Sequence, residues 1–191
     1  MKKINTKIIK MKTVDITFLN FSWSCIDLSN PIPVPNDFDT IPEEYMNEGN
    51  LDLSNNSISE TRVLPKKLKI CNLSVNAIEN WTSKMKFLIY LDISSNPIDD
   101  ISFRYFPAIQ FLLCFDCGLH SLDNHSDTLK YLDCSDNRLV TIPRLLPELV
   151  YLNVKENNRI CVYRELYSKL ETFLFNEQEL VNYYREDNRD D

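Results

Sequence analysis

An asparagine recurs along this chain at intervals of 20 or 21 residues. The series runs Asn56, Asn76, Asn96, Cys117, Asn137 and Asn157, so a cysteine stands at the one position that breaks it. Five and three places before each of these positions stands a pair of apolar or cysteine residues: Leu51/Leu53, Cys71/Leu73, Leu91/Ile93, Leu112/Cys114, Leu132/Cys134 and Leu152/Val154. One such unit cannot bury its apolar residues alone, so this periodicity predicts a solenoid whose turns stack in register.

Written out, the unit is LxxLxLxxNxI, which resembles the leucine-rich repeat over residues 48–160. The resemblance implies an α/β solenoid with a parallel sheet on its concave face. The asparagine amide is expected to satisfy backbone groups at the turn that follows each strand. Cys117 can stand in for an asparagine because a thiol is small and a weak donor.

The return from each turn to the next strand is short, because only about ten residues remain after the strand and the asparagine. Five prolines fall in these returns, at Pro65, Pro97, Pro107, Pro143 and Pro147. We therefore expect extended or 3₁₀ segments on the convex side rather than helices. The segment 137–157 is similar to short repeats of bacterial effectors and large DNA viruses, and such proteins generally bind other proteins.

Both ends of the solenoid need caps, because an open end exposes core and unpaired strand. Residues 161–185 are expected to form a helical cap, with apolar residues at helical spacing: Tyr163, Leu166, Leu170, Phe173 and Leu174. Together with Asn157 and Cys161, this cap resembles that of intracellular phosphatase-regulator repeat proteins. Residues 1–47 are expected to hold a basic leader and an irregular cap with a degenerate repeat at Ile26 and Leu28. Residues 186–191 are read as an acidic tail.

Charge separates the leader from the rest of the chain. The net charge is −7, yet five lysines precede every acidic residue, which leaves 16 basic against 28 acidic residues after residue 12: the five are Lys2, Lys3, Lys7, Lys10 and Lys12. The leader is either a solvated terminus or a contact for nucleic acid or another acidic surface. It lacks the apolar stretch of a signal peptide, and no run long enough to span a membrane occurs, so an intracellular, reducing location is expected.

The chemistry-bearing residues are few. The chain has two glycines and no phosphate-binding loop motif, and its two histidines, His120 and His125, form no nucleophilic set with other residues. Cys114 and Cys117 precede these histidines at a spacing that resembles zinc ligands. However, the register places Cys114 in the core and Cys117 in the recurring asparagine series, which we call the ladder. Adjacent strands also seldom give two cysteines such as Cys114 and Cys134 disulfide geometry. We expect six free thiols, no cofactor, no metal and no enzymatic activity.

Strand side chains alternate, so the residues that flank each inward pair should face outward on the concave side. The first column, before the pair, reads Asn50, Ile70, Tyr90, Phe111, Tyr131 and Tyr151. The second column, within the pair, reads Asp52, Asn72, Asp92, Leu113, Asp133 and Asn153. The third column, after the pair, reads Ser54, Ser74, Ser94, Phe115, Ser135 and Lys155. The fourth repeat thus predicts an exposed apolar patch of Phe111, Leu113 and Phe115 on an otherwise polar face.

Two interpretations of this face follow. Stacked tyrosines can be purely structural, whereas an apolar cluster rimmed by charge is typical of a protein-binding site. The sequence favours a non-enzymatic module that binds a partner protein with basic and apolar surface, through Ile70, Tyr90, Asp92, Phe111, Leu113, Phe115, Tyr131, Asp133 and Tyr151. The alternative is a structural subunit of a large assembly, such as a ribonucleoprotein particle or viral capsid, docked through its basic N-terminus and convex side. Neither interpretation involves a membrane or a small-molecule substrate.

Overall fold

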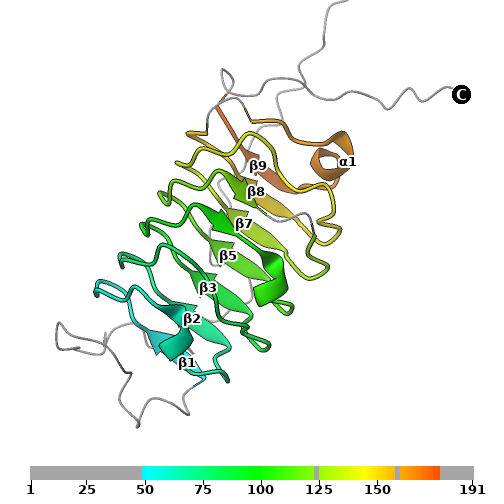
Figure 1. Ribbon diagram of the computed structural model, residues 1–191. Helices are drawn as coiled ribbons and strands as arrows, with labels where there is room; N and C mark the ends of the chain where they lie inside the picture. Colours follow the sequence, from blue (N-terminus) through cyan, green and yellow to red (C-terminus); the bar gives the residue numbers. More distant parts are fainter. Residues whose placement is uncertain (1–48, 123–124, 158–159, 177–191) are drawn as a thin grey trace, which may run out of the picture.

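A computed structural model describes residues 49–122, 125–157 and 160–176. Seven short strands stack into one parallel sheet in this part of the chain (Figure 1): β1 (Asn50–Asp52), β2 (Ile70–Asn72), β3 (Tyr90–Asp92), β5 (Phe111–Leu113), β7 (Tyr131–Asp133), β8 (Tyr151–Asn153) and β9 (Thr172–Leu174). They are hydrogen-bonded in chain order, and the partners lie one repeat apart, as Leu91 and Leu112 do. The chain is therefore a parallel-sheet solenoid in which each turn supplies one strand.

The return side of the solenoid, which leads from each turn back to the next strand, has little helix. Among the described residues it carries two short 3₁₀ helices, η4 (Thr61–Val63) and η5 (Phe103–Tyr105), and a two-stranded parallel sheet of β4 (Asp100–Ile101) and β6 (Ser121–Leu122). The one α-helix of the described residues, α1 (Arg164–Tyr167), is a single turn. Extended and 3₁₀ returns are what a 20-residue period leaves room for.

The core lies between the sheet and the return side. All twelve inward residues of the six predicted pairs belong to one buried cluster, and Leu53, Leu73, Leu91 and Leu112 are fully buried. From the return side, Trp81 and Phe106 add an edge-to-face ring pair with centroids 4.8 Å apart. Each buried Leu or Ile side chain contributes about 1.5–3 kcal/mol of transfer free energy, so the alternating pairs are the main source of stability.

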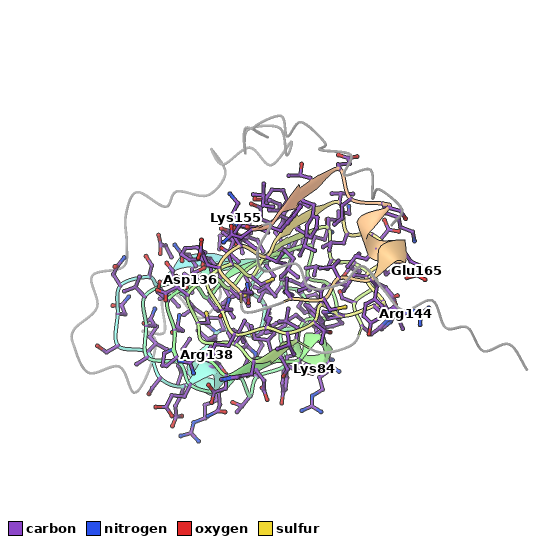
Figure 2. All side chains as sticks on the ribbon, turned by 90° about the horizontal axis from the view of Figure 1, so that it is seen from above. Lys84, Asp136, Arg138, Arg144, Lys155 and Glu165 are labelled. Carbon is purple, nitrogen blue, oxygen red and sulfur yellow. The ribbon has the colours of Figure 1, made fainter. Side chains whose placement is uncertain are left out.

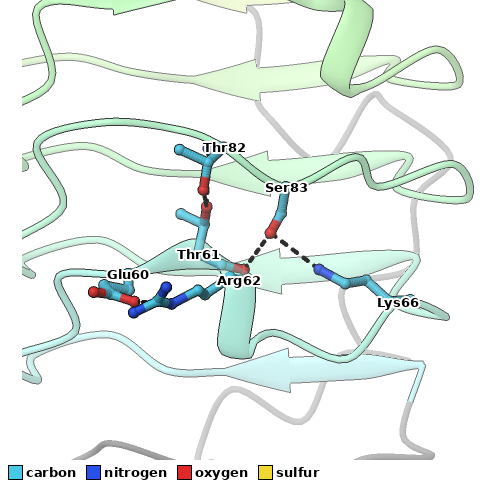
Figure 3. A network of polar contacts seen from close by, with 6 residues as sticks. All are labelled: Glu60, Thr61, Arg62, Lys66, Thr82 and Ser83. Atoms are coloured by element: carbon cyan, nitrogen blue, oxygen red, sulfur yellow. Dashed lines mark hydrogen bonds and ion pairs between the residues drawn. The ribbon is translucent and has the colours of Figure 1, made fainter.

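Hydrogen bonds on the return side join consecutive turns (Figure 3). The Ser83 hydroxyl donates to the Thr61 carbonyl at 2.8 Å and accepts from Lys66 Nζ at 3.0 Å. The Thr82 N–H donates to Thr61 Oγ1 at 3.1 Å. Desolvation by partial burial lowers the pKa of Lys66. These contacts satisfy backbone groups where the turns lack a continuous ladder.

The predicted C-terminal capping helix is wrong over residues 172–174. After α1 the chain returns to the sheet as β9, in which Phe173 pairs with Leu152 and faces the core. Leu170 and Phe175 pack against the same core. Leu170, Phe173 and Phe175 therefore repeat Leu149, Leu152 and Val154 at an interval of 21 residues, and a seventh turn extends the solenoid. The burial of Phe173 and the partial burial of Phe175 outweigh the helical spacing of this segment.

The leader and degenerate repeat predicted in residues 1–47, the end of the predicted cap and the tail at 186–191 lie outside the described residues. Within the described part, no helical segment has the length and hydropathy needed to cross a bilayer.

Candidate protein-binding face and the turns behind it

The position of Asn96 shows how each strand ends. Its Nδ2 donates to the Ile93 and Ser94 carbonyls of its own turn, at 2.9 and 3.3 Å, and to the Leu73 carbonyl of the preceding turn, at 2.9 Å. Its Oδ1 accepts the Ile78 N–H at 3.0 Å. One buried amide therefore satisfies four backbone groups and joins two turns, which explains why an asparagine recurs here.

The other ladder asparagines repeat this arrangement. Asn76, Asn137 and Asn157 each donate to one carbonyl of the preceding turn, at 2.9, 2.8 and 2.9 Å. Their Oδ1 atoms accept the N–H of Ile58, Leu119 and Leu139, respectively. Asn56, in the first described turn, donates to the Leu53 and Ser54 carbonyls of its own turn.

Cys117 replaces the hydrogen-bond donor of the ladder asparagines but not their acceptor. Its Sγ donates to the Ile93 carbonyl of the preceding turn at 3.3 Å and to the Phe115 carbonyl at 3.5 Å. Burial raises the pKa of the thiol to about 11, so it stays protonated and can donate. A thiol offers no acceptor comparable to Oδ1, and the Ile98 N–H donates instead to the Asn96 carbonyl at 2.8 Å. The sequence predicted the donor but not this redirected N–H group.

The residue before each ladder position adopts a left-handed conformation. Their φ angles lie between 51° and 57°, at Asn55, Val75, Ser95, Asp116, Asp136 and Glu156. This conformation turns the chain sharply away from the strand and is most easily reached by Asn and Asp among non-glycine residues. Val75 is β-branched and therefore strained there. This position was not predicted from the sequence, although half of its residues are Asn or Asp.

The polar residues of the second column also form hydrogen bonds that stabilise the turns. Oδ1 of Asp52, Asn72, Asp92 and Asp133 accepts the N–H two residues ahead, at 2.9–3.1 Å. Such Asx turns stabilise the point where a strand bends into a turn. Leu113 cannot accept a hydrogen bond, so the fourth turn lacks this contact. The acidic residues assigned to partner recognition are therefore also turn-forming residues.

The sheet has an outer face, defined here as the face opposite the core, and the first column lies on it. Ile70, Tyr90 and Phe111 form a separate apolar cluster there, against which Leu113 and Tyr131 pack. The predicted exposure of Phe111 is wrong: Phe111 and Tyr90 are each 7% exposed, and Ile70 is 9% exposed. In-register strands lie about 4.8 Å apart, so neighbouring side chains of one column cover each other's flanks.

The outer face remains accessible at its margins. Phe115 is 37% exposed, while Leu113, Tyr131 and Tyr151 are partly buried. The Tyr131 and Tyr151 rings stack with centroids 3.9 Å apart and an interplanar angle of 5°. Asn153 Nδ2 donates to both oxygens of Asp133, at 3.1 and 3.0 Å. The accessible surface thus combines aromatic edges with carboxylates that the turns hold in place.

Burial also sets the electrostatics of this face. Desolvation raises the pKa of Asp92, and Asp133 and Asp52 raise it further, against the opposing hydrogen bond from the Ser94 N–H. Burial likewise raises the pKa of Tyr90, and the charges of Asp92 and, to a smaller extent, Asp52 raise it further. Three carboxylates of like sign along one column therefore favour a cation close to Asp92.

Comparison with known proteins identifies the repeat. A family model for the leucine-rich repeat matches residues 128–149. These residues carry Leu129, Leu132, Cys134, Asn137 and Leu139, whose equivalents recur in register in the neighbouring turns. This chain is a leucine-rich repeat protein. A crystal structure of human 5T4 (Wnt-activated inhibitory factor 1, Trophoblast glycoprotein) has a TM-score of 0.42 and 19% sequence identity, covering 75% of this chain and 72% of that chain. The search of curated proteins gave no match.

In this leucine-rich repeat protein the described cysteines are free thiols. Cys114 and Cys134 are fully buried, and each Sγ donates to a carbonyl of the next turn, of Asp133 and Asn153 respectively, at 3.4 Å. Burial raises the pKa of both thiols well above its ordinary value. Cys25 lies outside the described residues. Among residues 49–122, 125–157 and 160–176, no group of three His, Cys, Asp or Glu side chains is arranged to hold a metal ion.

The histidines of this leucine-rich repeat protein lie on its return side. His125 Nε2 lies 3.0 Å from Asp127 Oδ2, and both side chains are exposed. The His120 backbone N–H donates to the Asp99 carbonyl at 2.9 Å. Neither histidine is placed with the outer-face residues, so the structure separates the titratable imidazoles from the candidate binding surface.

Proposed function

We propose that this protein is a non-enzymatic interaction module whose outer sheet face binds another protein. Leucine-rich repeats generally mediate protein–protein interaction, and this fold presents a continuous sheet face for that purpose. The observation that carries the proposal is the fourth turn. There Phe115 is exposed beside Leu113, at positions that hold serine and aspartate in the adjacent turns.

The chemistry of the accessible residues indicates the kind of partner. An aromatic side chain at the margin of a packed apolar cluster resembles the centre of a binding hot spot. The carboxylates of Asp52, Asp92 and Asp133 lie in one column beside it, and two of the three flank Leu113 on the neighbouring strands. A protein segment with an apolar side chain next to lysine or arginine fits this arrangement.

A paired set of variants tests the proposal. Leu113→Ser with Phe115→Ser removes the accessible apolar contact while the inward residues Leu112 and Cys114 stay in place. We expect a loss of about 2 kcal/mol per large side chain in partner affinity, which is roughly 30-fold each. Partners captured by the wild-type protein are identified by mass spectrometry, and their affinities for each variant are then measured by calorimetry.

The matched control is Val140→Ser with Leu145→Ser on the return side, since these side chains are similarly apolar and exposed. It should retain every partner. Phe111 is omitted from the test variant because it is buried, and its replacement would lower stability as well as binding. Unchanged affinity for all partners in the folded outer-face variant would exclude this face as the site.

The return side favours a second candidate, a subunit of a larger assembly. Val140 and Leu145 are 56% and 55% exposed there, and Leu145 and Tyr163 line a hollow of about 370 Å³. Arg144 lies beside Glu165, with Arg144 Nη2 3.6 Å from Glu165 Oε1 (Figure 2), and its guanidinium lies 5.7 Å from the Tyr163 ring centroid. Loss of partners in the Val140→Ser/Leu145→Ser variant alone would favour this candidate.

A further inference from the structure

Among the described residues, one buried polar side-chain atom has no hydrogen-bond partner, and it is Ser94 Oγ in the third column. Ser94 is fully buried. In the second turn, the equivalent hydroxyl of Ser74 donates to Asn72 Oδ1 at 2.8 Å. In the fifth turn, that of Ser135 donates to Asp133 Oδ1 at 2.7 Å. Native proteins leave few buried hydroxyls unpaired, because an unpaired one costs free energy, so the Ser94 hydroxyl requires a physical explanation.

The carboxylate beside this hydroxyl, that of Asp92, has unused acceptor positions. Within the described part of the chain it accepts one hydrogen bond, from the Ser94 N–H to Oδ1 at 2.9 Å. An ionised carboxylate offers about four acceptor positions. Desolvation raises the pKa of Asp92, and the Ser94 hydroxyl lies close enough to oppose this rise. Asp92 is only partly buried, so a donor from outside the sheet can reach its remaining positions.

The other two carboxylates of the second column differ from Asp92. Asn153 Nδ2 donates to both oxygens of Asp133, and the N–H and hydroxyl of Ser135 donate to its Oδ1. These four contacts fill the acceptor positions of Asp133. Asp52 lies in the first turn, about 14 Å across the sheet from β5 at the usual strand spacing. Asp92 therefore combines open acceptor positions with a place next to the accessible apolar residues.

Phe115 completes this group of side chains. Asp92 pairs with Leu113, and the two chains stay side by side beyond this pair, because the Ser95 N–H donates to the Phe115 carbonyl at 2.9 Å. Ser94 thus has Phe115 as its neighbour on the next strand. Phe115 is 37% exposed, so its ring can turn without leaving the core. A carboxylate, a hydroxyl and an aromatic ring are brought together at one place on the outer face.

We propose that Asp92, Ser94 and Phe115 bind one arginine side chain of the partner protein. This inference rests on the proposed function, because it names the group that the outer face recognises. A guanidinium has five N–H donors in one plane, so it can donate to Asp92 and to Ser94 Oγ together. Its flat face packs on an aromatic ring, which a lysine ammonium cannot match. Turning of the Phe115 ring uncovers the Ser94 hydroxyl, and the arginine then supplies its missing partner.

The arginine site makes stability and binding change in opposite directions in one variant. Ser94→Ala removes an unpaired buried hydroxyl, so it should raise the melting temperature of the free protein and weaken arginine binding several-fold. Ser135→Ala is the matched control, since its hydroxyl already donates to Asp133. It should lower the melting temperature and leave arginine binding unchanged.

NMR of the full-length protein with a peptide probe, N-acetyl-phenylalanyl-arginine amide, tests the site directly. We expect the probe to shift the carboxyl resonance of Asp92 and to lower the pKa of this group, because a nearby cation favours the ionised form. Affinity should fall several-fold in Asp92→Asn, and less in Asp133→Asn. The peptide with citrulline, a neutral isostere of arginine, and the peptide with lysine should both bind several-fold more weakly.

Equal binding of the citrulline or the lysine peptide would overturn the proposal, as would an Asp92 resonance that does not respond up to the solubility limit of the probe. Captured partners separate this failure from that of the proposed function. Wild-type affinity in Asp92→Asn and Ser94→Ala, with loss in Leu113→Ser/Phe115→Ser, would reject the arginine site and keep the outer face as the binding surface. Wild-type affinity in all three variants would reject both.

Discussion

The fourth turn and the turns on either side of it solve the same packing problem with different side chains. All three keep an inward pair on the strand, and these residues are fully buried. The neighbours then use Asp, Ser and Asn at the next outward and ladder positions. The fourth turn uses Leu113, Phe115 and Cys117 at those positions.

This difference separates what the fold requires from what it tolerates. The backbone does not change: Asp116 has a φ of 53°, and β5 keeps the register of β3 and β7. The cost falls on individual N–H groups. Ile98 loses the side-chain acceptor that other turns provide, and Leu113 accepts no hydrogen bond. The inward pair and the left-handed residue thus determine the turn, while the polar columns stabilise it and tolerate substitution.

The largest effect is expected from removing a ladder asparagine, which measures how much that residue contributes to the free energy of unfolding. Asn137→Ala removes five hydrogen bonds, including those in which Oδ1 accepts the N–H groups of Cys117 and Leu119. Several of these groups are buried, so we expect a loss of about 2–3 kcal/mol in the free energy of unfolding. Asn96→Ala removes four bonds and should cost slightly less. Urea denaturation measures both.

Asn96→Cys gives the third turn the side chain that the fourth turn carries at Cys117. Asn96→Cys should cost less than Asn96→Ala, because a thiol keeps the donor and loses only the acceptor. Asn50→Ala, at an exposed outer position, should have little effect. If all four variants unfolded at the same urea concentration, the ladder would not carry the stability assigned to it.

The second turn presents the opposite exception, since it keeps its ladder asparagine but has Val75 at the left-handed position. Val75→Asn should raise the free energy of unfolding by about 1 kcal/mol, because a left-handed conformation costs a β-branched residue about 1–2 kcal/mol. The melting temperature should rise by about 2–4 °C. Val140→Asn is the control, since Val140 is also exposed but is not among the residues with positive φ. An equal change in both variants would show that polarity, and not backbone strain, is responsible.

Cys117→Asn gives the fourth turn the ladder asparagine that its neighbouring turns have. An amide at this position would accept the Ile98 N–H, as Asn96 and Asn137 accept their counterparts. Because the Ile98 N–H already has a backbone acceptor, we expect a gain of only about 0.5–1 kcal/mol in unfolding free energy. Cys117→Ala should be destabilising. A loss of stability in Cys117→Asn would mean that the turn has adapted to the smaller side chain.

Much of this fold could be predicted from the sequence because its period is short and its inward residues hold to a strict pattern. The register of β1, β2, β3, β5, β7 and β8 and their inward pairs follow from the positions of the asparagines alone, whereas the small sheet of β4 and β6 was not predicted. β9 was missed because Leu166, Leu170 and Phe173 also fit helical spacing. In addition, Gln178 stands where the next asparagine is due, so the strongest marker of the repeat is absent.

The candidate site was harder to predict. The alternation of side chains along a strand predicts which face of the sheet each side chain occupies, and Phe111 and Tyr90 do lie opposite the core. It does not state what covers that face, so the burial of these residues could not be predicted. The Asx turns were also missed, because Asp52, Asp92 and Asp133 looked like surface charges available to a partner.

The smallest expected effect concerns Asp92, which lies in the third turn between Asn72 of the second turn and the apolar Leu113 of the fourth. Burial raises the pKa of this carboxyl in the folded state above its ordinary value of 3.8, so the folded protein binds the proton more tightly than the unfolded chain. The ionised carboxylate therefore lowers stability at neutral pH, and this loss develops as the pH rises from 3.8 through the raised pKa.

Asp92→Asn keeps the Oδ1 acceptor for the Ser94 N–H, as Asn72 does for Ser74, and removes the charge. It should raise the melting temperature at pH 7, and the gain should disappear below pH 3.8, where Asp92 is protonated in both states. Asp136→Asn, at an exposed residue, is the control. A gain that persists undiminished at low pH would show that the benefit comes from hydrogen bonding and not from the buried charge.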